Sequence, residues 1–361
     1  MMKTKEKDFS KIQKGDITMK KLSLLLATIM LISCMGLPAL AENTVEAAPF
    51  ASYEQVNEAI TVIPAEGDQI ELGYLNGVTA ILTVDGLQFK DLNGNGQLDI
   101  YEDWRADVED RVKDLYDQMT LAERAGLFYH VNTCGNPQGV DFADSRYMFS
   151  TESTVPDDNA TFPAKSMWYY INELQITTHL DNTNGTPEQQ VTYHNAMQAI
   201  AEDTRLGIPV VISNDRQYNA WGGMIDTAHD AFGAANDLEL SEKLWTIYSL
   251  ESRAVGIHVV LHPYSQELGS WNGEDPEYAG TMTRAEVAAI QVEGGTEACM
   301  KHFIARGGDS SFQDARSDAQ TVDNWMTAWA LALESNPKWV MTNGYGTGLS
   351  NTVHVDYDKE T

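Results

Sequence analysis

Residues 91–105, DLNGNGQLDIYEDWR, divide the chain into an N-terminal lead-in and a longer part in which apolar runs alternate with helical patterns. The first twelve of these residues match the EF-hand calcium loop, in which oxygen-bearing side chains recur at fixed positions. A hard cation needs six to eight oxygen ligands, and this spacing supplies them from one short segment. The predicted ligands are Asp91, Asn93, Asn95, Gln97 (through its backbone carbonyl), Asp99 and Glu102. The alternative is a turn rich in Asn and Gly that binds no ion.

Residues 1–41 include an export signal. Two lysines precede the apolar run at residues 22–37, which is too short for a comfortable transmembrane span. Ala39-Leu40-Ala41 then forms a cleavage site of the A-x-A type. The sequence therefore predicts a secreted or cell-surface protein without a transmembrane span, whose mature chain begins at Glu42.

Two alternatives concern this same region. LISC, at residues 31–34, resembles a lipobox, so Cys34 is the anchor if the protein is a lipoprotein. Met19 is a second good start, which leaves open whether residues 1–18 are translated.

The charge and the cysteines restrict the class of protein. The 361 residues carry a formal net charge of −29, and without the first 41 residues (seven Lys against three acidic residues) the charge is −33. So acidic a chain will not bind nucleic acid through charge, and it is better suited to solubility outside the cell and to cation binding. Cys134 and Cys299 alone make no disulfide framework, and the apolar surroundings of Cys299 predict a small buried side chain.

The lead-in, residues 42–104, reads as a spacer followed by short strands. Strands are predicted in the apolar runs ITVIPA, VTAILTV and LQF, with Asn76-Gly77 and Asp85-Gly86 as turn dipeptides. Helical spacing then predicts a helix over residues 105–124, and Thr120 and Glu123 form a capping box for the next helix.

From residue 105 to residue 361 the pattern is that of an α/β domain. Because the strands alternate with helices and are apolar on both faces, we expect a parallel sheet. Because the chain has no glycine-rich dinucleotide motif, a (β/α)8 TIM-type barrel is favoured. About five units do not close such a barrel, so the predicted barrel is incomplete. Strands are predicted at 127–131, 208–213, 257–262, 298–303 and 339–342, and helices at 186–205, 240–255, 276–293 and 321–334. Between them, residues 133–166 form a loop long enough to be suspected of function.

Function in such a barrel gathers where strands end. Four predicted strand ends carry suggestive residues, namely Asp215, Pro263-Tyr264, Lys301-His302 and Asn343-Gly344-Tyr345. A carboxylate accepts hydrogen bonds from hydroxyl groups, Lys and His donate them, and an aromatic ring stacks on a sugar. Taken singly, Asp215 could cap a turn and His302 could be a satisfied core histidine. Taken together, they predict a pocket for a polyhydroxylated ligand.

The residues from Leu87 to about Gly346 resemble the N-terminal barrel domain of glycoside hydrolase family 3, the β-glucosidase-like enzymes. The resemblance is closest to a secreted bacterial branch with the calcium-loop sequence before the barrel. It is carried by the order and spacing of DGLQFKDLNGNGQLDIYEDWR, QMTLAERAGL, TRLGIPVVISND, RAVGIHVVLHP, GEDPEYAG and ACMKHF.

The resemblance implies roles for four residues. Asp215 matches the carboxylate that holds sugar hydroxyls in the deepest subsite. Lys301 and His302 match a Lys-His pair that contacts the same sugar, and Tyr345 lies near a pocket tyrosine. Because neighbouring strand residues face opposite ways, we expect a bulge or a strained peptide at Lys301 and His302.

The sequence also departs from the family. The stretch YSQELGSWNGEDP lacks the arginine that usually precedes GEDP, and KHFIARGGD has Arg306 where the N-acetylglucosaminidases carry a catalytic histidine. The nucleophile aspartate belongs to a later strand than those found here. We therefore expect both the nucleophile and the acid/base beyond Thr361, and no catalytic residue is assigned within the 361 residues.

Two functions remain open at this stage. The first is the front part of a secreted retaining β-glycosidase, inactive as a fragment because retaining hydrolysis needs two carboxylates. The second is a non-catalytic surface protein that uses calcium to bind carbohydrate or a partner. In both cases a carbohydrate is the expected ligand, and calcium is the expected cofactor.

Overall fold

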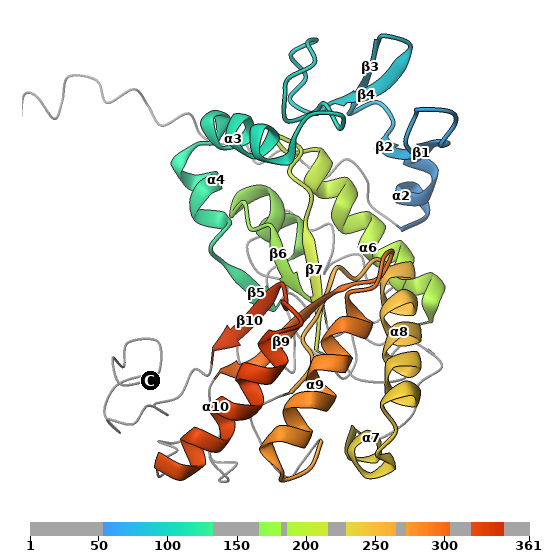
Figure 1. Ribbon diagram of the computed structural model, residues 1–361. Helices are drawn as coiled ribbons and strands as arrows, with labels where there is room; N and C mark the ends of the chain where they lie inside the picture. The colour runs from blue at the N-terminus through green and yellow to red at the C-terminus, as the bar shows by residue number, and fades with distance from the viewer. Residues whose placement is uncertain are drawn as a thin grey trace, which may run out of the picture. The chain divides into compact units, whose positions relative to one another are not determined.

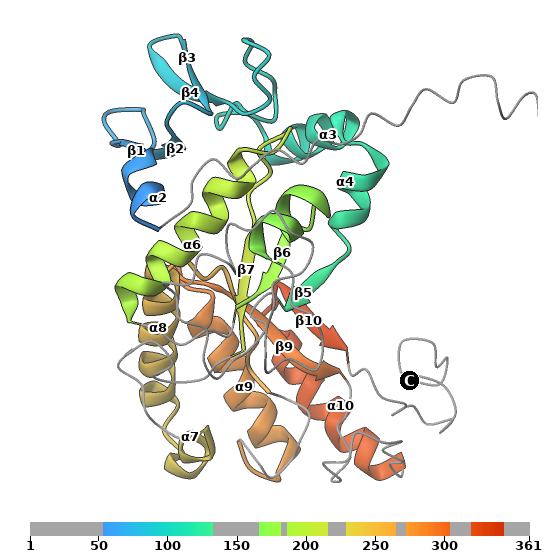
Figure 2. The same ribbon diagram turned by 180° about the vertical axis from the view of Figure 1, so that it is seen from behind.

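A six-stranded parallel sheet, curled into a half-barrel, organises the structure, with the strand order β10-β9-β8-β7-β6-β5 (Figures 1 and 2). The computed structural model describes residues 53–132, 166–181, 186–215, 229–264, 272–303 and 319–342. The strands are β5 (His130–Asn132), β6 (Thr178–Leu180), β7 (Val211–Asn214), β8 (Val259–Val260), β9 (Glu297–Phe303) and β10 (Trp339–Thr342). The predicted parallel α/β sheet is confirmed, and in the described part it has six strands.

Helices alternate with these strands along the chain and pack on the outer face of the sheet. They are α6 (Pro187–Glu202), α7 (His229–Ala235), α8 (Leu238–Ala254), α9 (Pro276–Ile290) and α10 (Ala319–Leu333), and a π-helix, η1 (Tyr169–Glu173), precedes β6. Val260, Ala298 and Met300 point outward into a core shared with α8, α9 and α10. Val259 and Cys299, one residue away, belong to a separate core on the inner face. This split follows from the alternation of side chains along a strand.

The helix boundaries follow local capping signals. Asp275 accepts a hydrogen bond from the Tyr278 backbone at the start of α9, with Pro276 in the first turn as predicted. Thr186 starts α6 with a capping box. The helix predicted over 105–124 is two helices, α3 (Val108–Gln118) and α4 (Leu121–Gly126), because the capping box of Thr120 begins a new helix.

The lead-in consists of a helix, α2 (Tyr53–Ala59), and two antiparallel hairpins, β1–β2 and β3–β4. The strands are β1 (Ile60–Ile63), β2 (Leu72–Leu75), β3 (Ala80–Val84) and β4 (Leu87–Asp91). Asp85-Gly86 forms the predicted turn of the second hairpin, with both residues at positive φ. Asn76-Gly77 also forms a turn, as predicted, with Gly77 at positive φ. This turn follows β2, a strand that the sequence did not predict.

One carboxylate fastens the lead-in to the α/β domain. Glu202, at the end of α6, accepts hydrogen bonds from the Leu75 backbone at 2.8 Å and the Thr79 hydroxyl at 2.5 Å. Its other oxygen pairs with Lys90 of β4 at 2.8 Å. Val56 and Leu75 meanwhile pack into a core that contains residues of α6.

Several sequence predictions lie outside the described residues, namely the export signal with Cys34, the loop at 133–166 and Tyr345. The described residues end at Thr342, so the expectation that the nucleophile and the acid/base lie beyond Thr361 also stays a prediction. Cys299 is buried, as predicted. Within the described ranges, no helix has both the length and the apolar character needed to cross a bilayer.

A buried carboxyl group on α9 makes the stability of this layer depend on pH. Glu286 is 3% exposed and accepts a hydrogen bond from the Asn272 side chain at 3.1 Å. Burial raises the pKa of Glu286 to about 7. The folded state therefore holds a proton that the unfolded chain releases near pH 4.5, so the contribution of Glu286 to stability decreases as the pH rises from about 4.5 to about 7.

Glu286→Gln keeps an oxygen acceptor for Asn272 and removes this titration. We expect the melting temperature of the variant, relative to that of the unchanged protein, to rise between pH 5 and pH 8. Burial lowers the pKa of His179 and His258 to about 4, and both titrate equally in the two proteins, so the difference isolates Glu286. A difference in melting temperature that stays constant over this pH range would contradict the assignment.

Candidate functional site

Asp215 and Lys301 meet at the carboxyl ends of the parallel strands. Asp215 follows β7 directly, Lys301 lies near the end of β9, and the Lys301 ammonium pairs with Oδ1 of Asp215. The Lys301 side chain is 2% exposed, whereas that of Asp215 is 36% exposed. The carboxylate therefore faces outward, and the ammonium lies behind it.

Tyr264 joins the two charges from the strand between them. It follows β8 and forms an isolated parallel bridge with Lys301. The Lys301 Nζ lies 4.1 Å from the centre of the Tyr264 ring, within range of a cation–π contact. The Tyr264 hydroxyl donates a long, 3.4 Å hydrogen bond to Oδ1 of Asp215.

His302 lies at an irregularity in the sheet. The register between β9 and β10 pairs Met341 with Lys301 and then Thr342 with Phe303, so it passes over His302. The predicted bulge is thus confirmed, and the peptide bond between Lys301 and His302 is cis. The His302 ring packs edge-on against Tyr264, with centroids 5.7 Å apart. The structure therefore brings together Asp215, Lys301 and His302.

A buried polar network supports the strand end before Asp215. Asn214 is fully buried, and its side-chain amide donates to the backbone oxygen of Asp181 at 2.6 Å. The Asp181 carboxylate lies 2.8 Å from Nε2 of His194, whose Nδ1 lies 2.5 Å from the Val255 carbonyl. Sequence reasoning missed this network, because Asp181 follows a three-residue strand without a recognisable pattern.

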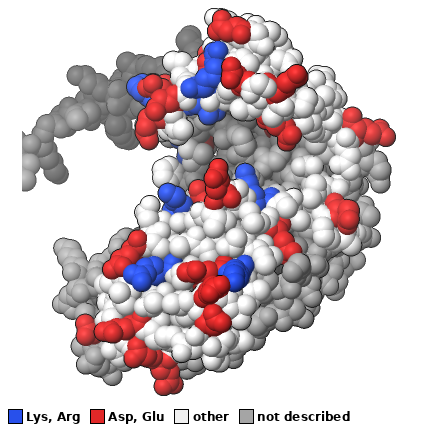
Figure 3. Space-filling view, turned by 45° about the vertical axis from the view of Figure 1, so that its right-hand side comes forward, with Lys and Arg blue, Asp and Glu red and all other residues white. Residues whose placement is uncertain are grey.

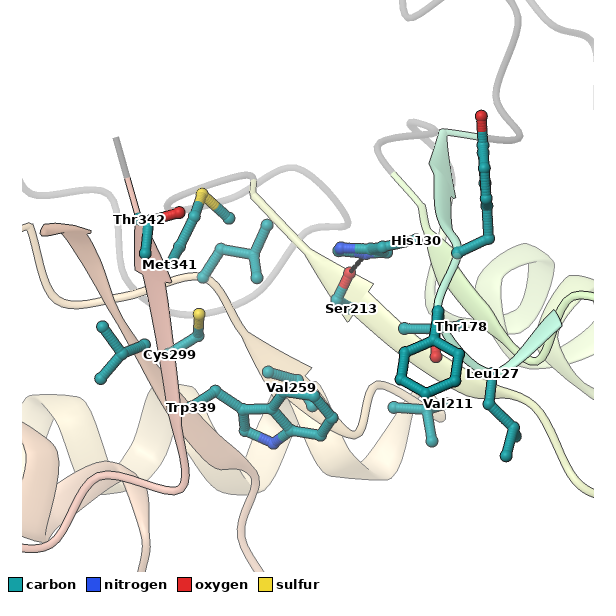
Figure 4. Close-up of a pocket in the computed structure, with 14 residues that line it drawn as sticks. Leu127, His130, Thr178, Val211, Ser213, Val259, Cys299, Trp339, Met341 and Thr342 are labelled. Atoms are coloured by element: carbon teal, nitrogen blue, oxygen red, sulfur yellow. Dashed lines mark hydrogen bonds between the residues drawn. The ribbon is translucent and has the colours of Figure 1, made fainter. Parts of the chain in front are cut away.

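An apolar cavity lies on the inner face of the same sheet. Its volume is about 520 Å³, and Figure 4 shows side chains from the two edge strands and the strands between them around it. Val211, Val259 and Cys299 line it, and the only polar contact drawn joins Nε2 of His130 to the Ser213 hydroxyl at 2.7 Å.

This cavity is not the predicted sugar site. Ser213 and Cys299 line it, whereas Asp215 and Lys301 lie two residues further along the same strands, toward the carboxyl ends. In a barrel, layers of inward-pointing side chains fill such a space. Burial raises the pKa of the Cys299 thiol to about 12 and lowers the pKa of His130, as expected of interior groups. We therefore assign the cavity to the barrel interior.

The predicted calcium loop is compact. Gly94 and Gly96 have positive φ, and Asp91 accepts hydrogen bonds from the backbone N–H groups of Asn95 and Gly96 at 3.0 and 2.9 Å. The side-chain amides of Asn93 and Asn95 both lie within 2.7 Å of one Asp99 oxygen.

The far end of the loop is closed by Glu102, which accepts from the backbone of Leu92 at 2.7 Å and of Asp99 at 3.1 Å. Within the described ranges, no group of three or more His, Cys, Asp and Glu side chains is gathered to hold a metal ion. The other predicted calcium ligands are the two asparagines and the Gln97 backbone carbonyl.

Acidic and basic side chains of the described residues are intermixed on the face shown in Figure 3. Figure 3 shows acidic side chains spread over one face of the molecule, with basic side chains interspersed among them. This distribution agrees with the net charge of −29.

The chain is similar in sequence to known β-glucosidases. A periplasmic β-glucosidase/β-xylosidase of Dickeya chrysanthemi is 30% identical over 290 residues, which cover 72% of this chain and 40% of that protein. The chain carries a β-glucosidase-like N-terminal domain of glycoside hydrolase family 3. β-Glucosidase C of Emericella nidulans is 25% identical over 276 residues, covering 68% of this chain and 41% of that protein. No protein-family model matches the chain.

Solved structures support the fold of this family 3 domain. An exo-1,3/1,4-β-glucanase from a Pseudoalteromonas species superposes with a TM-score of 0.51 at 16% identity, covering 66% of this chain and 30% of that one. The chain thus spans about 40% of the length of the curated relatives to which it is most extensively matched.

Proposed function

We propose that the chain forms the sugar-holding part of a secreted retaining β-glycosidase that acts on β-glucosides. One observation carries this proposal: Asp215 and Lys301, from two different strand ends, form a pair whose carboxylate remains partly exposed. The relationship to β-glucosidases and a β-glucosidase/β-xylosidase supports the substrate class.

The proposed chemistry is recognition rather than bond cleavage. The Asp215 carboxylate accepts hydrogen bonds from sugar hydroxyls, and its pairing with the Lys301 ammonium fixes it in place. Retaining hydrolysis needs two carboxyl groups about 5 Å apart. Asp215 is engaged with Lys301, and the nucleophile and the acid/base are expected beyond Thr361. We therefore expect residues 1–361 to bind sugar without turning it over.

Secretion is part of the proposal. Residues 19–41 have the three parts of an export signal. The Dickeya chrysanthemi relative is described as periplasmic, which supports a site of action outside the cytoplasm. The alternative function is calcium-dependent binding of carbohydrate by a non-catalytic surface protein, which would use the same Asp215 site. Absence of turnover in a longer form of the protein would favour this alternative.

Sugar binding tests the proposal directly. Isothermal titration of the 361-residue chain with D-glucose and D-xylose should detect binding, and Asp215→Asn and Lys301→Met should each weaken it at least about tenfold, because a charge-assisted hydrogen bond contributes about 1.5–3 kcal/mol. Lys243→Met, which removes an exposed lysine on α8, is the matched control and should bind normally.

An aryl β-glucoside provides the second readout. Turnover that survives in Lys301→Ala would point to a contaminating enzyme. Turnover by the unchanged chain that Asp215→Asn abolishes would contradict the expected inactivity of residues 1–361, because it would place the nucleophile inside this sequence. Failure to bind either sugar would overturn the proposal.

We also propose that residues 91–102 bind one Ca²⁺ as a structural ion. Asp91 and Glu102 are each 5% exposed, and burial raises the pKa of Glu102. A bound divalent cation would compensate these buried charges. Leu92 and Tyr101, from the loop and its end, pack against Leu206 and Met119, so an ordered loop stabilises the join to the α/β domain.

Calcium should raise the melting temperature of the unchanged protein. By mass action, a calcium concentration of 100 times Kd adds about 2.7 kcal/mol to the free energy of unfolding. Asp91→Ala and Glu102→Ala should abolish this calcium-dependent rise, whereas Glu66→Gln, in an exposed turn outside the loop, should keep it. Calorimetry with calcium and with EDTA measures the effect. An equal melting temperature of the unchanged protein in both solutions would mean that the loop is only a turn.

A further inference from the structure

The ring of Tyr264 contacts every described member of the proposed sugar site. Its face lies 4.1 Å from the Lys301 ammonium, its hydroxyl reaches Asp215, and its ring makes an edge contact with the His302 ring. The sequence has no arginine between Pro263 and Gly273. Within the described part of that stretch, Tyr264 is the residue that contacts Asp215 and Lys301.

The backbone fixes where Tyr264 can lie. Lys301 donates its backbone N–H to the Pro263 carbonyl at 3.0 Å, and Tyr264 and Lys301 form a parallel bridge. Tyr264 is thereby held at the end of β8, between the strand that leads to Asp215 and the strand that carries Lys301.

Buried aromatic rings hold the side chain from behind. The His262 ring packs on Tyr264 with centroids 5.3 Å apart. His262 in turn contacts Trp245 at 5.7 Å and Tyr248 at 6.3 Å, both of which lie on α8 and are buried. Tyr264 thus has little freedom to rotate away from the pair.

The contact matters because the ammonium is desolvated. Lys301 as a whole residue is 1% exposed, so water does not stabilise its charge. A buried charge needs compensating partners, and the negative face of an aromatic ring is one of them. Asp215 supplies the opposite charge, and the Tyr264 ring covers the ammonium on a second side.

We infer that Tyr264 is a positioning residue of the sugar site, whose ring holds the Lys301 ammonium against Asp215 so that the carboxylate is presented to an uncharged sugar. This inference rests on the proposed function. The exposed member of the pair is the carboxylate, so we expect it to repel the carboxylate of an anionic sugar such as D-glucuronate.

Two variants separate the ring from the hydroxyl. Tyr264→Leu removes both, and Tyr264→Phe keeps the ring. In titrations of the 361-residue chain with D-glucose, we expect Tyr264→Leu to weaken binding about tenfold and Tyr264→Phe to stay within about threefold, because the 3.4 Å hydrogen bond is weak. D-Glucuronate should bind the unchanged protein more weakly than D-glucose.

Tyr116→Leu is the matched control. It removes another tyrosine with a cation–π contact, to Arg124 at 4.0 Å, on the remote helix α3. Glucose binding should be unchanged in this variant.

A second readout does not depend on any ligand. A ring face shields nearby protons, so the ε-methylene protons of Lys301 should resonate upfield in NMR spectra of the unchanged protein and of Tyr264→Phe, but not of Tyr264→Leu. Rescue of both readouts by phenylalanine distinguishes positioning from a general loss of structure.

The outcomes are separable. Unshielded Lys301 protons in the unchanged protein would overturn the inference whether or not glucose binds. Normal glucose binding by Tyr264→Leu, despite loss of the shielding, would also overturn it. Shielding without any glucose binding by the unchanged protein would refute the proposed function and, with it, the sugar-positioning role, while leaving the contact itself established.

Discussion

The buried ammonium of Lys301 is the constraint on which the candidate site depends. Removing an ion from water costs several kcal/mol even after the protein has relaxed around it, so a lysine that is 1% exposed requires compensating partners. Asp215 and Tyr264 meet this requirement from two other strand ends. Their convergence is possible because parallel strands with helical crossovers end at the same edge of the sheet.

The side chains on the two faces of the sheet belong to different cores. Outward side chains such as Val260 and Met300 pack against the helices, and inward side chains such as Val259 and Cys299 line the interior. One layer nearer the strand ends, the inward positions become Asp215 and Lys301. The same alternation that builds the core therefore also aims the charged residues at one place.

Much of this arrangement could be predicted from the sequence. Apolar runs such as 339–342 and caps such as Thr186 and Asp275 are local signals, and the structure has the corresponding elements. The convergence of Asp215 with Lys301 and His302 followed from placing them at strand ends. Tyr345 lies outside the described residues, and its role stays a prediction.

Other features depend on contacts that no local pattern encodes. The strand β6 has three residues, and it is defined by parallel pairing with both β5 and β7. The strand end at Tyr264 was apparent, but its contact with the Lys301 ammonium depends on the bridge between β8 and β9. Likewise, the role of Glu202 depends on contacts with residues more than 100 positions away in the chain.

A double-mutant cycle on Asp215 and Lys301 tests the central claim most directly. The free energy of unfolding is measured in urea for Asp215→Asn, Lys301→Met and the double variant, with the exposed pair Glu239 and Lys243 as the reference cycle. The account predicts a coupling energy of about 1–3 kcal/mol for the site pair, against about 0.3–0.5 kcal/mol for the exposed pair. Additive effects of Asp215→Asn and Lys301→Met would contradict it, because the ammonium would then not depend on the carboxylate.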